Sequence, residues 1–297
     1  MHVGPFVNCA AEVFRTVAFC LVIAVPLAGC GSSSADDDGL EIVTSFYPLT
    51  FLAREVAGDG ARVTDLTPPG AEPHDIELTA RQVVDASEAD LLLYLGGDFQ
   101  PVVSELATST QGDALDALES LPAKDKRAAD PHVWLAPMLM ASLGDELAER
   151  LATVHPEHAS SYRQHAVELS VDLEELDRDF QEGLEKCSRR ELVVSHEAFG
   201  YLADCYGLIQ TGIAGLDPEA EPSPSRLAEV ADYARRHAVT TIFFETLVSP
   251  RVAEALARET GAEVASLDPL EGEPGEGDYF TVMRANLQVL RQGLGCP

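Results

Sequence analysis

The chain has 297 residues, of which 46% are hydrophobic and 24% are charged, so a soluble body with a sizeable core can form. Asp and Glu number 50 against 20 Lys and Arg, which gives a formal net charge of −30 at pH 7. A surface this acidic repels phosphate backbones, and nucleic acid is therefore excluded as a partner.

Residues 1–29 are predicted to be a lipoprotein signal peptide. Their apolar stretch, 16–28, is about 13 residues long, whereas a helix that spans a bilayer needs about 20. It runs into Gly29 and Cys30, and a cysteine after small residues is the predicted site of lipid attachment. The alternative is an ordinary cleaved signal. Residues 30–39 form the predicted flexible tether, which would hold the protein at the outer face of the bacterial cytoplasmic membrane.

Short apolar runs alternate with helical patterns along the rest of the chain, which is typical of parallel sheets covered by helices. In the first half we expect strands and helices, in chain order, at 41–46, 49–57, 62–67, 79–86 and 90–95. In the second half we expect strands at 191–195, 207–213, 241–244 and 262–267, each followed by a helix-compatible stretch. The predicted fold class is therefore α/β, with two small parallel-sheet lobes.

A largely uninterrupted helical pattern covers 156–187, between the two halves. Its expected buried stripe consists of apolar residues at three- to five-residue spacing: Tyr162, Val167, Val171, Leu176, Phe180 and Leu184. A helix of this length would be about 45 Å long and could cross the back of both lobes. We therefore predict an N-terminal lobe at 40–150, a backbone linker helix within 151–188 and a C-terminal lobe at 189–297.

Three cysteines remain once the leader and Cys30 are set aside: Cys187, Cys205 and Cys296. Three cysteines allow at most one disulfide among them, and export places the protein in an oxidising compartment. Cys187 closes the long helical segment and Cys296 ends the chain, whereas Cys205 lies on the apolar side of a short helix. We therefore predict a disulfide between Cys187 and Cys296, with Cys205 in the core.

Three histidines and one aspartate lie where an apolar run gives way to a loop: His74, His132, His196 and Asp268. Ligands of open α/β sheets gather beyond the carboxyl ends of the strands, and His196 and Asp268 each directly follow a predicted strand. Three neutral imidazoles and one carboxylate complete a tetrahedral zinc shell. The sequence therefore predicts one transition-metal site without an open position for catalysis.

An ordered set of motifs surrounds these four residues. It comprises VTSFYPL at 43–49, GAEPHD at 70–75 followed by ELT at 77–79, DPHVWL at 130–135, SHEAFGYL at 195–202, EPSP at 221–224, Glu245, LDPL at 267–270, and the closing Tyr279, Met283, Asn286 and Leu287. Over nearly all of the mature chain, this set resembles the metal-binding lipoproteins of bacterial zinc and manganese ABC importers, the cluster A-I or cluster 9 family.

The resemblance implies that the metal lies in the cleft between two α/β lobes joined by a backbone helix. His74 and His132 would bind it from the first lobe, and His196 and Asp268 from the second. The implied partners are a membrane permease and its ATPase, and the protein is expected to be a monomer. Zn²⁺ would be the transported ligand.

The residue at the third ligand position distinguishes between metals. Manganese-handling relatives typically have a carboxylate where His196 stands, so three imidazoles favour zinc, and a manganese-binding component is the alternative. Many zinc relatives also carry a His-rich loop before the second histidine ligand, but residues 107–129 contain no histidine. We therefore predict no metal-scavenging loop. Gln100 departs from the family, which commonly has a glutamate near this point.

A surface zinc-dependent hydrolase is the main rival class. Catalytic zinc usually has three protein ligands and an open position, whereas four ligands are predicted here. After His196 and Glu197, a zincin would need a second histidine where Gly200 stands. Glu245 is the only candidate general base, and its expected role is to orient a ligand imidazole. We therefore predict that the protein is not an enzyme. An adhesin or a structural lipoprotein stays open as a third class, because surface contacts leave no motif in the sequence.

Overall fold

The computed structural model describes residues 39–297 except 128 and 248. The predicted signal peptide, the predicted lipid attachment at Cys30 and nearly all of the tether lie outside these residues. Among the described helices, none combines the length and the apolar character that a membrane crossing requires.

The first lobe is built on a four-stranded parallel sheet in the order β2-β1-β3-β4. Its strands are β1 (Leu40–Thr44), β2 (Ala61–Asp65), β3 (Leu91–Tyr94) and β4 (Asp113–Asp116), and its helices are α1 (Tyr47–Ala57), α2 (Ala80–Glu88), α3 (Pro101–Ala107) and α4 (Ala117–Ser120). The central strand β3 is a continuous apolar run, as expected of a parallel strand with both faces covered. Thr79 caps α2 as the sequence predicts, within a capping box completed by Gln82.

The second lobe repeats this plan with the order β6-β5-β7-β8, again all parallel. Its strands are β5 (Glu191–Val194), β6 (Ile209–Gly212), β7 (Thr241–Phe244) and β8 (Glu263–Ser266), and its helices are α7 (Gly200–Tyr206), α8 (Pro224–Arg236), α9 (Arg251–Thr260) and α10 (Tyr279–Gly293). In each sheet the chain reverses its direction of winding beside the first strand, and that switch point is where ligands of such sheets bind. The predicted α/β class with two parallel-sheet lobes is confirmed.

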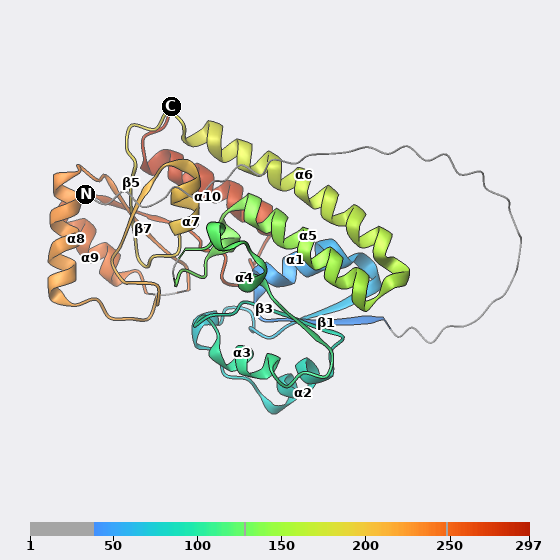
Figure 1. Ribbon diagram of the computed structural model, residues 1–297. Coiled ribbons are helices and arrows are strands. Elements are labelled where there is room, and N and C mark those ends of the chain that lie inside the picture. The colour runs from blue at the N-terminus through green and yellow to red at the C-terminus, as the bar shows by residue number, and fades with distance from the viewer. Residues whose placement is uncertain (1–38, 128, 248) are drawn as a thin grey trace, which may run out of the picture.

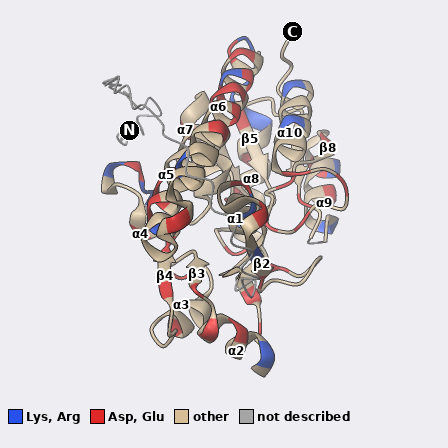
Figure 2. Cartoon of the chain, turned by 90° about the vertical axis from the view of Figure 1, so that its right-hand side faces the viewer, with Lys and Arg blue, Asp and Glu red and all other residues tan. Residues whose placement is uncertain are grey.

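Two long antiparallel helices, α5 (Pro137–Val154) and α6 (Ala159–Leu184), lie side by side in the upper right of Figure 1. With 26 residues, α6 is about 39 Å long. It contacts α1 in the first lobe and α10 in the second, so it is the expected connecting helix. Figure 2 shows acidic residues along this helix, and most of them are exposed.

The predicted buried stripe of α6 is wrong at two positions. Val167 and Val171 are 50% and 58% exposed, whereas Ala166, Leu169 and Leu173 are buried. The buried residues recur at spacings of three and four along the side that faces α5, α1 and α10. Each residue turns the helix by about 100°, so Val171, two residues from both Leu169 and Leu173, lies on the opposite side of the helix, and Val167 lies beyond the edge of the stripe.

One hydrophobic cluster runs through both lobes. It contains residues of α1, β3, α5, α6, α7 and α10, and the lobes have additional small clusters only on their outer sides. The two lobes are therefore not separately cored bodies on a flexible hinge, because the helices α5, α6 and α10 join their interiors.

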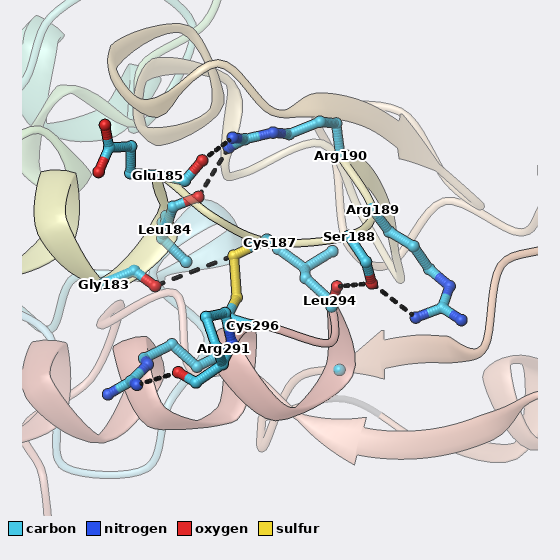
Figure 3. The surroundings of a disulfide bond; sticks show 12 residues. Gly183, Leu184, Glu185, Cys187, Ser188, Arg189, Arg190, Arg291, Leu294 and Cys296 are labelled. Carbon is cyan, nitrogen blue, oxygen red and sulfur yellow. Dashed lines mark hydrogen bonds between the residues drawn. A yellow bond between two sulfur atoms is a disulfide. The ribbon is translucent and has the colours of Figure 1, made fainter.

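A disulfide joins Cys187, three residues beyond α6, to Cys296, near the end of the chain (Figure 3). This is the pair expected from the sequence. The backbone N–H of Ser188 donates to the carbonyl of Gly295 at 3.3 Å, so hydrogen bonds reinforce the same junction. Cys205 is half-buried against the shared core.

Replacing both Cys187 and Cys296 with serine is expected to lower the free energy of unfolding by about 3–5 kcal/mol, because the bridge closes a long loop and restricts the unfolded chain. The sequence separation of the two cysteines is 109. Denaturant unfolding would measure the change. Ser188→Ala is the control, because it keeps the disulfide and removes only the hydroxyl, which donates to the carbonyl of Leu294 at 3.2 Å and accepts from Nη1 of Arg189 at 3.4 Å. Equal unfolding free energies for the serine variant and the wild type would contradict this prediction.

Candidate metal centre

Four side chains from four loops meet between the two sheets. Donor atoms of His74, His132, His196 and Glu271 all lie within 4.8 Å of one another. Oε1 of Glu271 is 3.3, 3.2 and 3.4 Å from Nε2 of the three histidines in that order. Nε2 of His132 and Nε2 of His196 are 3.3 Å apart. The arrangement therefore places three imidazole nitrogens and one carboxylate oxygen around a common point.

The first-lobe residue His74 lies on a short 3₁₀ turn, Pro73–Asp75, beyond β2. The carboxylate of Glu72 accepts its backbone N–H at 3.1 Å and caps the turn. The buried amide of Gln100 donates to the carbonyl of Pro73 at 3.0 Å, so Gln100 fixes the loop that carries His74. Phe99 packs edge-on against the imidazole, with 4.5 Å between ring centroids.

His132 is fully buried and is oriented by Asp130, two residues earlier. Oδ1 of Asp130 accepts the backbone N–H of His132 at 3.1 Å and lies 2.8 Å from its Nδ1. A proton held on Nδ1 leaves Nε2, which faces the centre, free to donate its lone pair to a metal. The ring of Trp134 also contacts this imidazole, with 5.1 Å between ring centroids.

His196 follows β5 in the second lobe, and Glu245 follows β7. Nδ1 of His196 is 2.9 Å from one carboxylate oxygen of Glu245 and 2.8 Å from the other. Ser195 donates its hydroxyl to the same carboxylate at 2.7 Å. Glu245 is buried and does not belong to the four converging residues, so its position is that of a residue that orients an imidazole rather than of a ligand.

At the fourth position the structure places Glu271 and not Asp268, which corrects the sequence prediction. Oδ1 of Asp268 accepts the backbone N–H of Leu270 at 2.7 Å, and the backbone of Asp268 exchanges two hydrogen bonds with the Asn286 amide, at 3.0 and 2.6 Å. Leu270 has a φ of 59°, a left-handed conformation that is rare for its type. This turn directs Glu271, rather than the first acid after β8, into the cleft.

Only one sequence signal pointed to Glu271: a second carboxylate three residues beyond Asp268. Tertiary contacts decide which of the two acids, Asp268 or Glu271, reaches the centre. They are the clamp of Asn286 on Asp268 and the hydrogen bond, 2.7 Å long, that Nε1 of Trp134 donates to the carbonyl of Pro269. Neither contact is visible as a local pattern in the sequence.

The ionisable groups of the centre stabilise one another's charged forms. Burial would raise the pKa of Glu271, but hydrogen bonds from the three imidazoles hold it well below its usual range. Burial disfavours the charged form of His196, yet its bonds to Glu245 and Glu271 raise its pKa to about 10. Asp130 and Glu271 raise the pKa of His132 against the effect of burial in the same way. Without metal, the centre therefore holds protons at neutral pH that a cation would displace.

A cavity of about 650 Å³ adjoins the centre on the side of His74. Its walls include Phe99 and Arg127 from the first lobe and Asp217 from the second. The His74 side chain is 14% exposed, whereas those of the other three converging residues are at most 1% exposed. The cavity therefore connects the centre to solvent through its least buried member.

Two α/β lobes with a shared connecting helix, and a closed set of three imidazoles and one carboxylate between them, define a binding protein for a single metal cation. The comparisons with known proteins agree with this class. The chain belongs to the family described as zinc-uptake complex component A, periplasmic, whose sequence pattern matches residues 42–293. The resemblance drawn from the sequence motifs is thereby confirmed.

Two curated relatives illustrate the similarity. The high-affinity zinc uptake system protein ZnuA of Bacillus subtilis is 33% identical in an alignment of 308 positions, gaps included, which covers 94% of this chain and 96% of the relative. The zinc-binding lipoprotein AdcA of Streptococcus pneumoniae is 32% identical over 294 residues, which cover 91% of this chain. This chain spans only 58% of the length of AdcA.

A solved structure is also similar. The Zn(II)-bound ZnuA-like domain of Streptococcus pneumoniae AdcA matches with a TM-score of 0.76 and 33% sequence identity, over 86% of this chain and 98% of that chain. The family is a substrate-binding component of transport rather than an enzyme family.

Proposed function

We propose that this protein is the zinc-binding component of an ABC importer, which captures Zn²⁺ outside the cytoplasmic membrane and delivers it to a permease driven by an ATPase. The observation that supports this most is the convergence of His74, His132, His196 and Glu271 within 4.8 Å. Three imidazoles and one carboxylate match the donors and the number that zinc takes in closed sites. The names of the relatives point to the same cargo.

Zinc is favoured over manganese by the chemistry of the donors. Manganese prefers oxygen ligands in an octahedral arrangement, whereas imidazole nitrogen suits zinc. A carboxylate at the position of His196 would lie against both Glu245 and Glu271, which are 2% and 0% exposed, and would bring three buried acids together. A hydrolase would need an open coordination position, and the four converging donors leave none.

Two further parts of the proposal concern the organisation of the chain. The division into an N-terminal lobe (40–150), a linker helix (151–188) and a C-terminal lobe (189–297) is supported by the positions of the two sheets and of α6 between them. Lipid on Cys30 would keep the protein at the membrane beside its permease. The lipoprotein name of AdcA supports this anchor.

The proposal is tested by titrating metal-free protein with Zn²⁺ and with Mn²⁺. Trp134 is the only tryptophan of the sequence and contacts His132, so its fluorescence reports on the centre directly. We expect one zinc ion per chain, a change in fluorescence and much weaker binding of manganese. Addition of the zinc-loaded protein should also stimulate the ATPase of its permease. Binding of manganese in preference to zinc would contradict the proposed cargo.

Zinc binding is expected to strengthen as pH rises. The pKa of His196 is raised to about 10, so this imidazole carries an extra proton at neutral pH without metal, and Asp130 and Glu271 raise the pKa of His132 as well. An extra proton on either imidazole must leave before its Nε2 can bind. Affinity should rise by about tenfold per pH unit for each displaced proton, from about pH 6.5 towards the His196 pKa of about 10. Calorimetry in buffers of different ionisation enthalpy would count the protons. An affinity that is flat between pH 6.5 and 8.5 would contradict this expectation.

The apo protein should show the opposite dependence. The pKa of His196 is raised by folding, so its ion pairs with Glu245 and Glu271 stabilise the metal-free fold fully below about pH 6.5. That contribution is lost as pH rises towards about 10.

A further inference from the structure

The loop that carries His132 rests on the second lobe. The backbone N–H of Arg127 donates to the hydroxyl of Tyr201 at 2.7 Å, and the same hydroxyl donates to the carbonyl of Asp130 at 3.3 Å. Tyr201 is buried and lies on α7, which begins four residues after His196. One side chain of the second lobe therefore contacts both Arg127 and Asp130.

A row of charged groups follows the same path. The guanidinium of Arg127 donates from Nε to Oδ2 of Asp130 at 3.0 Å and from Nη1 to the carboxylate of Asp204 on α7. The other oxygen of Asp130 lies 2.8 Å from Nδ1 of His132. A continuous series of hydrogen bonds thus leads from α7, through Arg127 and Asp130, to an imidazole of the metal centre.

The contact with α7 is close. A Cβ atom placed on Gly200 would lie 2.8 Å from Nε of Arg127 and still closer to the Asp130 carboxylate. A glycine at the first position of α7 therefore lets this row of groups pack directly against the helix.

We propose that Arg127, Asp204 and Tyr201 form a clasp between the lobes that positions His132 and slows the release of zinc. The proposal rests on the function proposed above. His132 and His196 come from different lobes, and their Nε2 atoms are only 3.3 Å apart. A bound ion keeps both imidazoles only while the two loops stay together, and the clasp joins the loop of one histidine to the helix that follows the other.

The alternative is an ordinary surface ion pair without influence on the centre. Arg127 and Asp204 have side chains that are 33% and 35% exposed, and ion pairs this exposed add little to stability. Asp130, which joins Arg127 to His132, has a side chain only 6% exposed. The two interpretations therefore differ in what they predict. If the pair is only a surface ion pair, its removal should change neither zinc release nor stability. If it is part of the clasp, its removal should speed zinc release and leave the stability of the fold nearly unchanged.

The test measures zinc release from Arg127→Gln, Asp204→Asn and the double variant by stopped-flow fluorescence of Trp134 with excess chelator. Loss of a group that orients a metal ligand costs about 10–100-fold in affinity, so we expect Arg127→Gln to release zinc at least about tenfold faster. Asp204→Asn should accelerate release less, because Arg127 keeps its bond to Asp130. The double variant should resemble Arg127→Gln, since both substitutions break one connection.

Arg235→Gln is the matched control. It removes an exposed arginine paired with Glu259 at 2.8 Å on α8 and α9, away from the centre, and should release zinc at the wild-type rate. Tyr201→Phe is a second probe, because it keeps the ring and removes both hydroxyl bonds; it should also accelerate release. The association rate and the thermal unfolding midpoint of the apo Arg127→Gln and Asp204→Asn proteins should stay close to those of Arg235→Gln.

Two results would overturn the clasp. One is release from Arg127→Gln at the wild-type rate. The other is a fall in the apo unfolding midpoint of Arg127→Gln, well below that of Arg235→Gln, that accounts for the faster release. Failure of the proposed function is a different result, because the wild-type protein itself would then show no zinc-dependent change in fluorescence, and both proposals would be refuted.

Discussion

Glu271→Gln is expected to weaken zinc binding by at least about a hundredfold, while Asp268→Asn leaves it within a few-fold of the wild type. Loss of a group that merely orients a ligand already costs about 10–100-fold, so loss of a direct donor should cost more. Oε1 of Glu271 lies within 3.4 Å of all three imidazole nitrogens, and an amide there lacks the charge that offsets the cation.

Asp268→Asn is the matched control because it also turns an acid of the same loop into its amide. An asparagine keeps an oxygen that accepts the Leu270 N–H, which is the contact that Asp268 makes in the structure. Competition with a chelator of known zinc affinity would measure both variants. If Asp268→Asn lost more affinity than Glu271→Gln, the sequence prediction would be restored and the placement of Glu271 refuted.

His196→Gln should also lower zinc affinity by at least about a hundredfold. In the proposed site Nε2 of this imidazole binds the metal, and its Nδ1 lies 2.8 Å from the nearer carboxylate oxygen of Glu245. A glutamine amide can donate to Glu245 in its place, so the substitution removes the metal donor without leaving that buried acid alone.

His237→Gln is the control for this substitution. His237 follows α8, its side chain is 41% exposed, and its Nδ1 lies 3.4 Å from Glu191. It should bind zinc like the wild type. The same chelator competition applies, and a His196→Gln protein whose affinity stays within tenfold of the wild type would show that His196 is not a ligand.

Most of the fold could be predicted because the central strands β1, β3, β5 and β7 lie in apolar runs and helical patterns separate them. The strand β4 was not predicted, since it has four residues and aspartates at both ends, Asp113 and Asp116. It belongs to the sheet through its pairing with β3, and such pairing leaves no periodic signal in so short a segment. The predicted buried face of α6 was wrong at Val167 and Val171 because these residues are as apolar as those that the helix buries.

The candidate centre could be predicted for three of its four converging residues. His74, His132 and His196 stand in short motifs that the sequence shows directly, next to Pro73, two residues after Asp130 and just beyond β5. The position of Glu271 depends on the left-handed conformation of Leu270 and on contacts of its loop with Asn286 and Trp134, which are distant in the sequence. Long-range contacts of this kind decide which of two neighbouring acids turns inward.

The hydrophobic cluster common to both lobes limits how the cargo can leave. Swinging the lobes apart would bring leucines of α5, α6 and α10 into water, at about 25 cal/mol for each Å² of apolar surface exposed. Displacing a loop at the rim of the cleft exposes far less. In the proposed transport, a permease that accepts the ion would need to distort only a few polar contacts at the cleft mouth, and the rest of the molecule would act as a fixed frame from which the ion is withdrawn.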